Sequence, residues 1–159
     1  IKVSILFICF LVVFGCNDTP KKESKPTTPE VVEQKAKELN LILNSNDQMQ
    51  FDKKVLSASP GQKVTLTLNH TGRGNKMIMG HNFVLLKSGI DVDDFARRAE
   101  EAIDSEYIPE GDEMIAYTTL IGGGETTSVT FEAPSTGIYT FICTFPAHYQ
   151  LMKGQLIVK

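Results

Sequence analysis

The sequence predicts an all-β fold: a β-sandwich of about eight short strands with one inserted helix. From about residue 38 onward, short apolar segments, several of them alternating with polar residues, are separated by turn-forming residues. One segment, residues 91–105, instead has the apolar spacing of an amphipathic helix. A domain of about 120 residues is long enough to bury one core between two sheets.

The expected strands follow one another with short turns between them. The clearest is residues 63–69, after a turn at Pro60 and Gly61, because Val64, Leu66 and Leu68 alternate onto one face. The other segments with strand character are residues 39–43, 50–52, 55–57, 82–86, 115–117, 126–131, 137–143 and 154–158.

Residues 91–105 predict one helix inserted between two strands. Val92, Phe95, Ala99 and Ile103 recur at helical spacing, so we expect them to pack on the sandwich. The arginine and glutamate residues between them are expected to form a solvated outer face.

The first 36 residues are expected to lie outside the folded domain, which should span residues 37–159. Residues 1–15 have the short apolar run of a secretory signal peptide, too short to span a membrane comfortably. Cys16 ends this run and is predicted to be lipidated; in the alternative, the protein is secreted and Cys16 is incidental. Residues 16–36, rich in proline and polar residues, are expected to form a flexible linker. Lipid at Cys16 would hold the protein at the periplasm or cell surface, anchored to the membrane without spanning it.

Composition excludes little but does exclude a nucleic-acid partner. The chain is 42% hydrophobic and 22% charged, which is ordinary for a globular protein. Its net charge of −3 provides no basic field for nucleic acid. Function must therefore be inferred from the motifs.

The C-terminal segment places three metal-ligand types close together. Cys143 ends an expected strand, and His148 and Met152 follow in the next loop, with Pro146 limiting its flexibility. His81 supplies a second imidazole from a distant strand. One thiolate, two imidazoles and a weak thioether form the ligand set of a blue-copper site. An unpaired cysteine in an exported protein also needs an explanation, and a bound metal supplies one.

This ligand set predicts an electron carrier and not an enzyme. With His81 and His148 as ligands, only His70 is left, and it is expected to be structural or exposed. Asn82 follows a ligand, so its side chain can reach the backbone near Cys143, where N–H groups bonded to sulfur would tune the reduction potential. Gly80 could present its carbonyl to the ion.

The chain resembles the azurins, which are bacterial cupredoxins, over about residues 40–159. The resemblance is carried by residues 46–51, 79–82, 120–125, 128–131, 143–148 and 151–154. It implies a Greek-key sandwich and one type 1 copper, with His81, Cys143 and His148 as equatorial ligands. Met152 and the carbonyl of Gly80 would be axial.

The resemblance also implies the surroundings of the copper. Asn82, Thr144 and Phe145 would lie around the ligands, and electrons would leave through the edge of His148. An apolar docking patch around that edge would comprise Met49, Met79, Phe145, Pro146, Ala147 and Leu151. The chain departs from the family in three ways: no cysteine pair follows Cys16, Ala147 stands where glycine is usual, and Phe83 replaces tryptophan.

The leading hypothesis is a monomeric, lipid-tethered carrier that docks transiently with cytochromes, oxidases or reductases. The main alternative is a protein that stores or delivers copper, or confers copper resistance. A third reading is a hydrolase in which Cys143 is the nucleophile and Asn82 orients a histidine. The same ligands would also accept zinc.

Overall fold

The structure is a computed structural model and describes residues 38–159. The predicted signal peptide, Cys16 and the linker lie outside the described residues. Among the described residues, no helix has the length and apolar character needed to cross a membrane.

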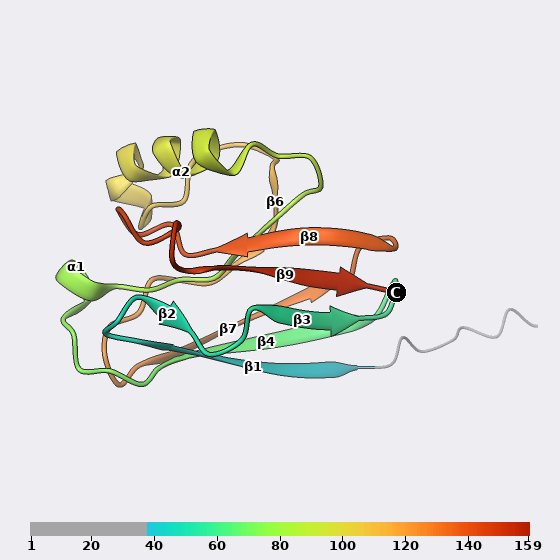
Figure 1. Cartoon of the computed structure of the whole chain (residues 1–159), viewed down its shortest axis with the longest axis horizontal. Coiled ribbons are helices and arrows are strands. Elements are labelled where there is room, and N and C mark those ends of the chain that lie inside the picture. Colours follow the sequence, from blue (N-terminus) through green and yellow to red (C-terminus); the bar gives the residue numbers. More distant parts are fainter. Residues whose placement is uncertain (1–37) are drawn as a thin grey trace, which may run out of the picture. The chain divides into compact units, whose positions relative to one another are not determined.

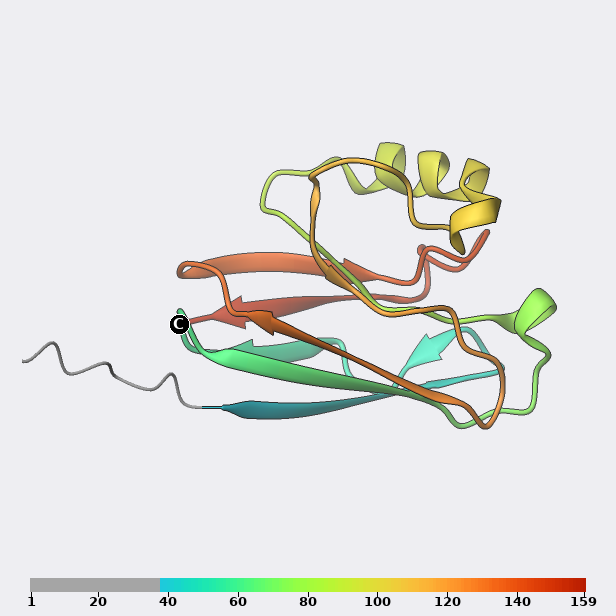
Figure 2. The ribbon, with the colours of Figure 1, turned by 180° about the vertical axis from the view of Figure 1, so that it is seen from behind.

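Two sheets pack face to face (Figures 1 and 2). One has the strand order β2 (Gln50–Phe51), β1 (Leu39–Asn46), β4 (Lys63–His70) and β7 (Thr126–Glu132). The other has the order β3 (Val55–Ala58), β9 (Lys153–Val158), β8 (Gly137–Ile142), β5 (Val84–Leu86) and β6 (Met114–Tyr117). The β1–β4 and β3–β9 pairs are parallel, and the other pairs are antiparallel. The predicted β-sandwich is confirmed, with nine strands in the described residues instead of about eight.

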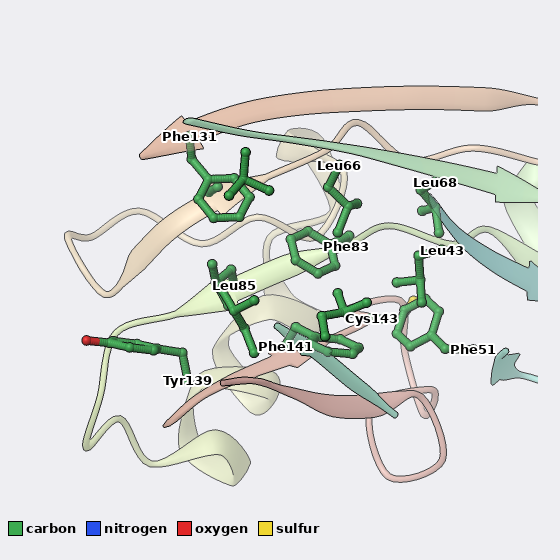
Figure 3. Packing of buried hydrophobic residues seen from close by; sticks show 14 of the residues in the cluster. Leu43, Phe51, Leu66, Leu68, Phe83, Leu85, Phe131, Tyr139, Phe141 and Cys143 are labelled. Atoms are coloured by element: carbon green, nitrogen blue, oxygen red, sulfur yellow. The ribbon is translucent and has the colours of Figure 1, made fainter. Parts of the chain in front are cut away.

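The core lies between the two sheets and reaches the end of β8. Val64, Leu66 and Leu68 are fully buried, as the alternation in this segment predicted. Figure 3 shows Cys143 among the side chains of this core, close to Phe141. The cysteine is therefore surrounded by apolar residues and not by solvent.

The inserted helix is shorter than predicted, and one of its expected core residues is exposed. Helix α2 (Val92–Glu101) begins at Asp91, whose side chain caps the first turn, and it buries Phe95 and Ala99. The helical backbone is interrupted at Ala102, and the 3₁₀ turn η1 (Ile103–Ser105) follows. This interruption takes Ile103 off the apolar face of α2. The prediction that Ile103 packs on the sandwich is wrong, because 63% of its surface is exposed.

A second helix, α1 (Lys76–Met79), was missed by the sequence analysis. It is a single turn that begins after Asn75, whose side chain accepts a hydrogen bond from the backbone N–H of Met77. One turn is too short to show helical periodicity. It lies at the same end of the sandwich as the β8–β9 loop, and β1 begins at the opposite end (Figure 1).

Two neighbouring residues of β1 test this packing. Leu43 is fully buried, whereas Ile42 is 56% exposed. We expect Leu43→Ala to lower the free energy of unfolding by about 2–5 kcal/mol, because it leaves a cavity in the core. Ile42→Ala should change it by no more than about 0.5 kcal/mol. Urea unfolding of both variants checks this, and equal losses would contradict the described orientation of β1.

Candidate metal centre

Three potential ligand side chains converge at the end of the sandwich where α1 lies. The sulfur of Cys143 lies 3.9 Å from Nδ1 of His81 and 3.8 Å from Nδ1 of His148, and the two Nδ1 atoms are 3.2 Å apart. All three residues are buried. His81 precedes β5, whereas Cys143 and His148 lie in the loop after β8. The structure thus brings together the three residues that the sequence analysis proposed as equatorial ligands.

Backbone and ring contacts fix the position of His81. Its backbone exchanges two hydrogen bonds with Ile121, each of 2.9 Å. Its ring Nε2 lies 2.9 Å from the carbonyl oxygen of Asn46 and therefore donates to it. In that tautomer the lone pair of Nδ1 points to the sulfur of Cys143. A metal ligand needs this arrangement: one ring nitrogen is held by an acceptor and the other is free to bind.

The β8–β9 loop is closed by its own backbone. Cys143 donates to the carbonyl of Met152 at 3.0 Å, and Met152 donates to the carbonyl of His148 at 2.8 Å. His148 in turn donates to the carbonyl of Phe145 at 3.0 Å. Met152 is fully buried in the same cluster as Cys143, so its thioether lies in an apolar environment. Its role as an axial ligand stays a prediction, as does that of the Gly80 carbonyl.

Asn82 connects the two segments that supply the ligands. Its side-chain oxygen accepts from the backbone N–H of Thr144 at 2.9 Å, and its side-chain nitrogen donates to the hydroxyl of Thr144 at 2.7 Å. The backbone N–H groups of Asn82 and Phe145 lower the pKa of Cys143. Asn82 therefore holds the loop against the strand and, through its own N–H, supports negative charge on sulfur.

Without a metal the site is electrically neutral. Burial raises the pKa of the Cys143 thiol to about 12, against the weaker effect of the two backbone N–H groups. Burial also lowers the pKa values of His81 and His148 to about 4. Near neutral pH the three groups are thus a thiol and two uncharged imidazoles. A soft metal cation that displaced the thiol proton would bring positive charge into a site that is otherwise neutral.

His70 packs against His81 and is held by its own hydrogen bonds. It is buried, and its ring centroid lies 4.4 Å from that of His81. Its Nε2 is 3.0 Å from the carbonyl oxygen of Met79, and its Nδ1 is 3.1 Å from the backbone nitrogen of Gly72, which donates to it. Of the two expectations for His70, structural or exposed, the structure shows the structural one.

Asp47 organises the loop that leads to His81, and the sequence analysis did not single it out. Its carboxylate accepts from the backbone N–H groups of Arg73 at 2.8 Å and Gly74 at 2.9 Å, and these bonds lower its pKa. A Cβ atom at Gly72 or Gly74 would lie less than 3 Å from the carboxylate. The alternation of glycines around Arg73 was the available signal, because only glycine lets the backbone approach a side chain this closely.

The comparisons with known proteins agree with this geometry. Residues 37–159 match the copper binding proteins of the plastocyanin/azurin family. The chain belongs to this family. The azurin of Bordetella pertussis is 40% identical over 130 residues, which cover 76% of this chain and 84% of that protein. The azurin of Pseudomonas fluorescens biotype C is 41% identical over 128 residues, covering 77% of this chain and 99% of that protein.

One similar solved structure and one longer relative extend the comparison. Auracyanin A, a "blue" copper protein of Chloroflexus aurantiacus, has a TM-score of 0.71 at 34% identity, covering 77% of this chain and 99% of that chain. Outer membrane protein H.8 of Neisseria gonorrhoeae is 42% identical over 118 residues, covering 72% of this chain and 64% of that protein.

The family membership and the donor set together identify the cofactor as copper. A buried thiol and two imidazoles with facing Nδ1 atoms are the donors that a copper–thiolate site requires. Cys143 is the cysteine that the described part of the chain contributes, and it is free, so its sulfur is available to a metal.

The residues of the apolar patch differ in their exposure to solvent. This is the patch that the resemblance to the family implied. Leu151 is 54% exposed and Ala147 is also exposed, whereas Met49, Met79 and Pro146 are partly buried. Phe145 is mostly buried and packs against His148, with ring centroids 4.7 Å apart. Phe145 therefore adds little exposed area to the patch, and its part in docking stays a prediction. Met77 and Ile78 of α1, which the sequence analysis left out, are both more exposed than Leu151.

Ala147, at a position where the resemblance implies glycine, has a strained backbone. Its φ is +64°, in the left-handed region, which costs a residue with a Cβ atom about 1–2 kcal/mol. Its N–H donates to Glu100 of α2 at 3.3 Å. This bond joins the inserted helix to the ligand loop.

We expect Ala147→Gly to stabilise the protein. Relief of the left-handed strain exceeds the entropic cost of glycine, so the free energy of unfolding should rise by about 0.5–1 kcal/mol. Ala102→Gly is the matched control, because Ala102 has a φ of −89° and should lose about 0.5–1 kcal/mol instead. Urea unfolding of the metal-free variants measures both changes. A loss at both positions would contradict the strain at Ala147.

The buried histidines predict a pH dependence of the metal-free protein. The pKa values of His81 and His148 are about 4 when folded, against 6.5 for an unperturbed histidine. Between these pH values the unfolded chain therefore binds more protons than the folded chain does. The contribution of the two histidines to the free energy of unfolding is thus complete above about pH 6.5 and falls as the pH is lowered toward 4. Urea midpoints of the metal-free chain at about pH 7 and about pH 5 should differ, and less so for His148→Gln. An equal difference in both proteins would show that other groups are responsible.

Proposed function

We propose that this protein carries single electrons between redox proteins of the cell envelope. The observation that carries the proposal is the buried convergence of the Cys143 sulfur with the Nδ1 atoms of His81 and His148, all within 4.8 Å of one another. Bound copper supplies the one-electron couple. The residues of the chain hold the donor atoms at fixed positions, so little rearrangement accompanies a change of charge.

The surroundings of the donors favour a carrier over a hydrolase. A Cys–His hydrolase needs a partner that orients the histidine. Asn82 is bonded to Thr144 instead, and His70 to Met79 and Gly72. Asn82 is thus not placed to orient a histidine beside Cys143, as the hydrolase reading requires.

Electrons are proposed to pass at the ligand end, through His148. His148 is 3% exposed, whereas His81 is fully buried. The exposed apolar residues around it permit weak, brief docking, which redox encounters require. Cytochromes, oxidases and reductases are the proposed partners, and the chain is proposed to act as a monomer.

The relatives support a location in the cell envelope. One of them is named as an outer membrane protein, and others are azurins. We retain the proposal that Cys16 carries lipid and that residues 16–36 tether the domain. β1, the first described strand, begins at the end of the sandwich opposite α1 (Figure 1).

Titration of the purified metal-free chain with Cu(II) tests the proposal. We expect an intense visible band, because a thiolate bound to Cu(II) is the chromophore. The band should saturate at one copper per chain, and a mild reductant should bleach it reversibly. Cys143→Ser should lack the band. Thr67→Ala, on the outer side of β4 and remote from the ligands, should keep it.

A colourless complex, or a band that resists reduction, would sink the carrier proposal. The first result would indicate that Cys143 does not bind the metal. The second would favour copper storage or delivery, because a stored ion need not change its oxidation state.

A further inference from the structure

A small cavity lies beside the ligand loop, separate from the exposed Leu151. It has a volume of about 90 Å³ and is lined by Lys76, Met77, Ile103, Glu106, Tyr107, Leu120 and Phe145. These residues come from α1, from η1 and the two residues after it, from the connection between β6 and β7, and from the ligand loop. The volume has room for about one aliphatic side chain and is far below the roughly 300–1,000 Å³ of a site for a drug-sized ligand.

Two of the residues that line this cavity are exposed apolar side chains. Met77 on α1 is 75% exposed and Ile103 on η1 is 63% exposed. The backbone break at Ala102 turns Ile103 outward, although its spacing matches the buried face of α2. Exposed apolar residues gathered around a hollow are a common feature of protein interaction sites.

Aromatic contacts join the cavity to the metal centre. Tyr107 packs edge-on against Phe145, with ring centroids 5.1 Å apart, and Phe145 packs against His148 at 4.7 Å. A group seated in the cavity against Phe145 is therefore one ring away from a ligand of the metal.

The charges beside the cavity differ from those beside Leu151. Glu100 and Asp104 lie close to Ile103 in the sequence, and Glu100 reaches the ligand loop at Ala147. Glu101 is paired with Arg97 at 3.9 Å. Lys76 at the rim is paired with Glu106, so it adds no net charge. By contrast, Lys54 bonds to the carbonyl of Leu151. The cavity thus has an acidic flank, whereas the patch around Leu151 has a basic neighbour.

We propose that this cavity is a second docking site, which receives an apolar side chain of a basic redox protein. The inference rests on the proposed electron-carrier function. Lysine residues of the partner would face Glu100 and Asp104, while its apolar residue enters between Met77 and Ile103. The acidic flank makes association fast at low ionic strength and slower as salt is added.

Stopped-flow reduction of a basic cytochrome c by the copper-loaded, reduced chain tests this site. Ile103→Lys places a positive charge at the cavity and should lower the second-order rate constant about tenfold at low salt. Ile138→Lys is the matched control: Ile138 is 57% exposed, and it lies near the start of β8, whereas the ligands follow the end of that strand. We expect this control to change the rate constant less than about twofold. Both variants should keep the visible band and midpoint potential of the parent chain.

Leu151→Lys separates the two surfaces. If it slows cytochrome reduction about tenfold while Ile103→Lys matches Ile138→Lys, docking occurs around Leu151 and the cavity proposal is overturned. If the parent chain reduces ferricyanide but not the basic cytochrome, the proposed partner chemistry is wrong. If it reduces neither, the carrier function itself fails, which is a different outcome from failure of the cavity.

Discussion

The structure depends on holding one thiol and two imidazoles together inside an apolar core. Burial keeps these groups neutral, since it raises the pKa of Cys143 and lowers those of the histidines. The two Nδ1 atoms lie 3.2 Å apart, within hydrogen-bond distance of one another. The surrounding hydrogen bonds hold this arrangement, and a metal cation is the partner that satisfies all three donors at once.

That constraint is met by two segments that are far apart in the sequence. The loop after β8 is closed by backbone bonds among Cys143, His148 and Met152. Hydrogen bonds to Ile121 and Asn46 fix His81. Asp47, next to Asn46, holds the loop that contains Gly72 and Gly74. Asn82 ties the two segments together. Each donor is thus positioned by bonds that need no metal, which suits a site that must change its charge without changing its shape.

Much of the fold and the donor set could be predicted from the sequence because the signals were local. Alternation revealed β4, and the short spacing from Cys143 revealed the ligand loop. The errors lie where tertiary context decides. Helical spacing placed Ile103 in the core, but a backbone break at Ala102 turned it outward. Asp47 carries no motif, because its importance comes from backbone groups more than twenty residues away.

The inserted helix supplies no proposed copper ligand, so its packing on the ligand loop needs another reason. It contributes the bond from Ala147 to Glu100, and the segment after it supplies Tyr107, which packs on Phe145, and the exposed Ile103. The bond to Glu100 and the side chain of Ile103 lie at the surface, whereas Tyr107 packs on the core cluster of the donors through Phe145. The sandwich can therefore conserve the metal geometry while the insertion varies the adjacent surface. In the proposed carrier, such a division would let changes in α2 and η1 alter the choice of partner without altering the metal site.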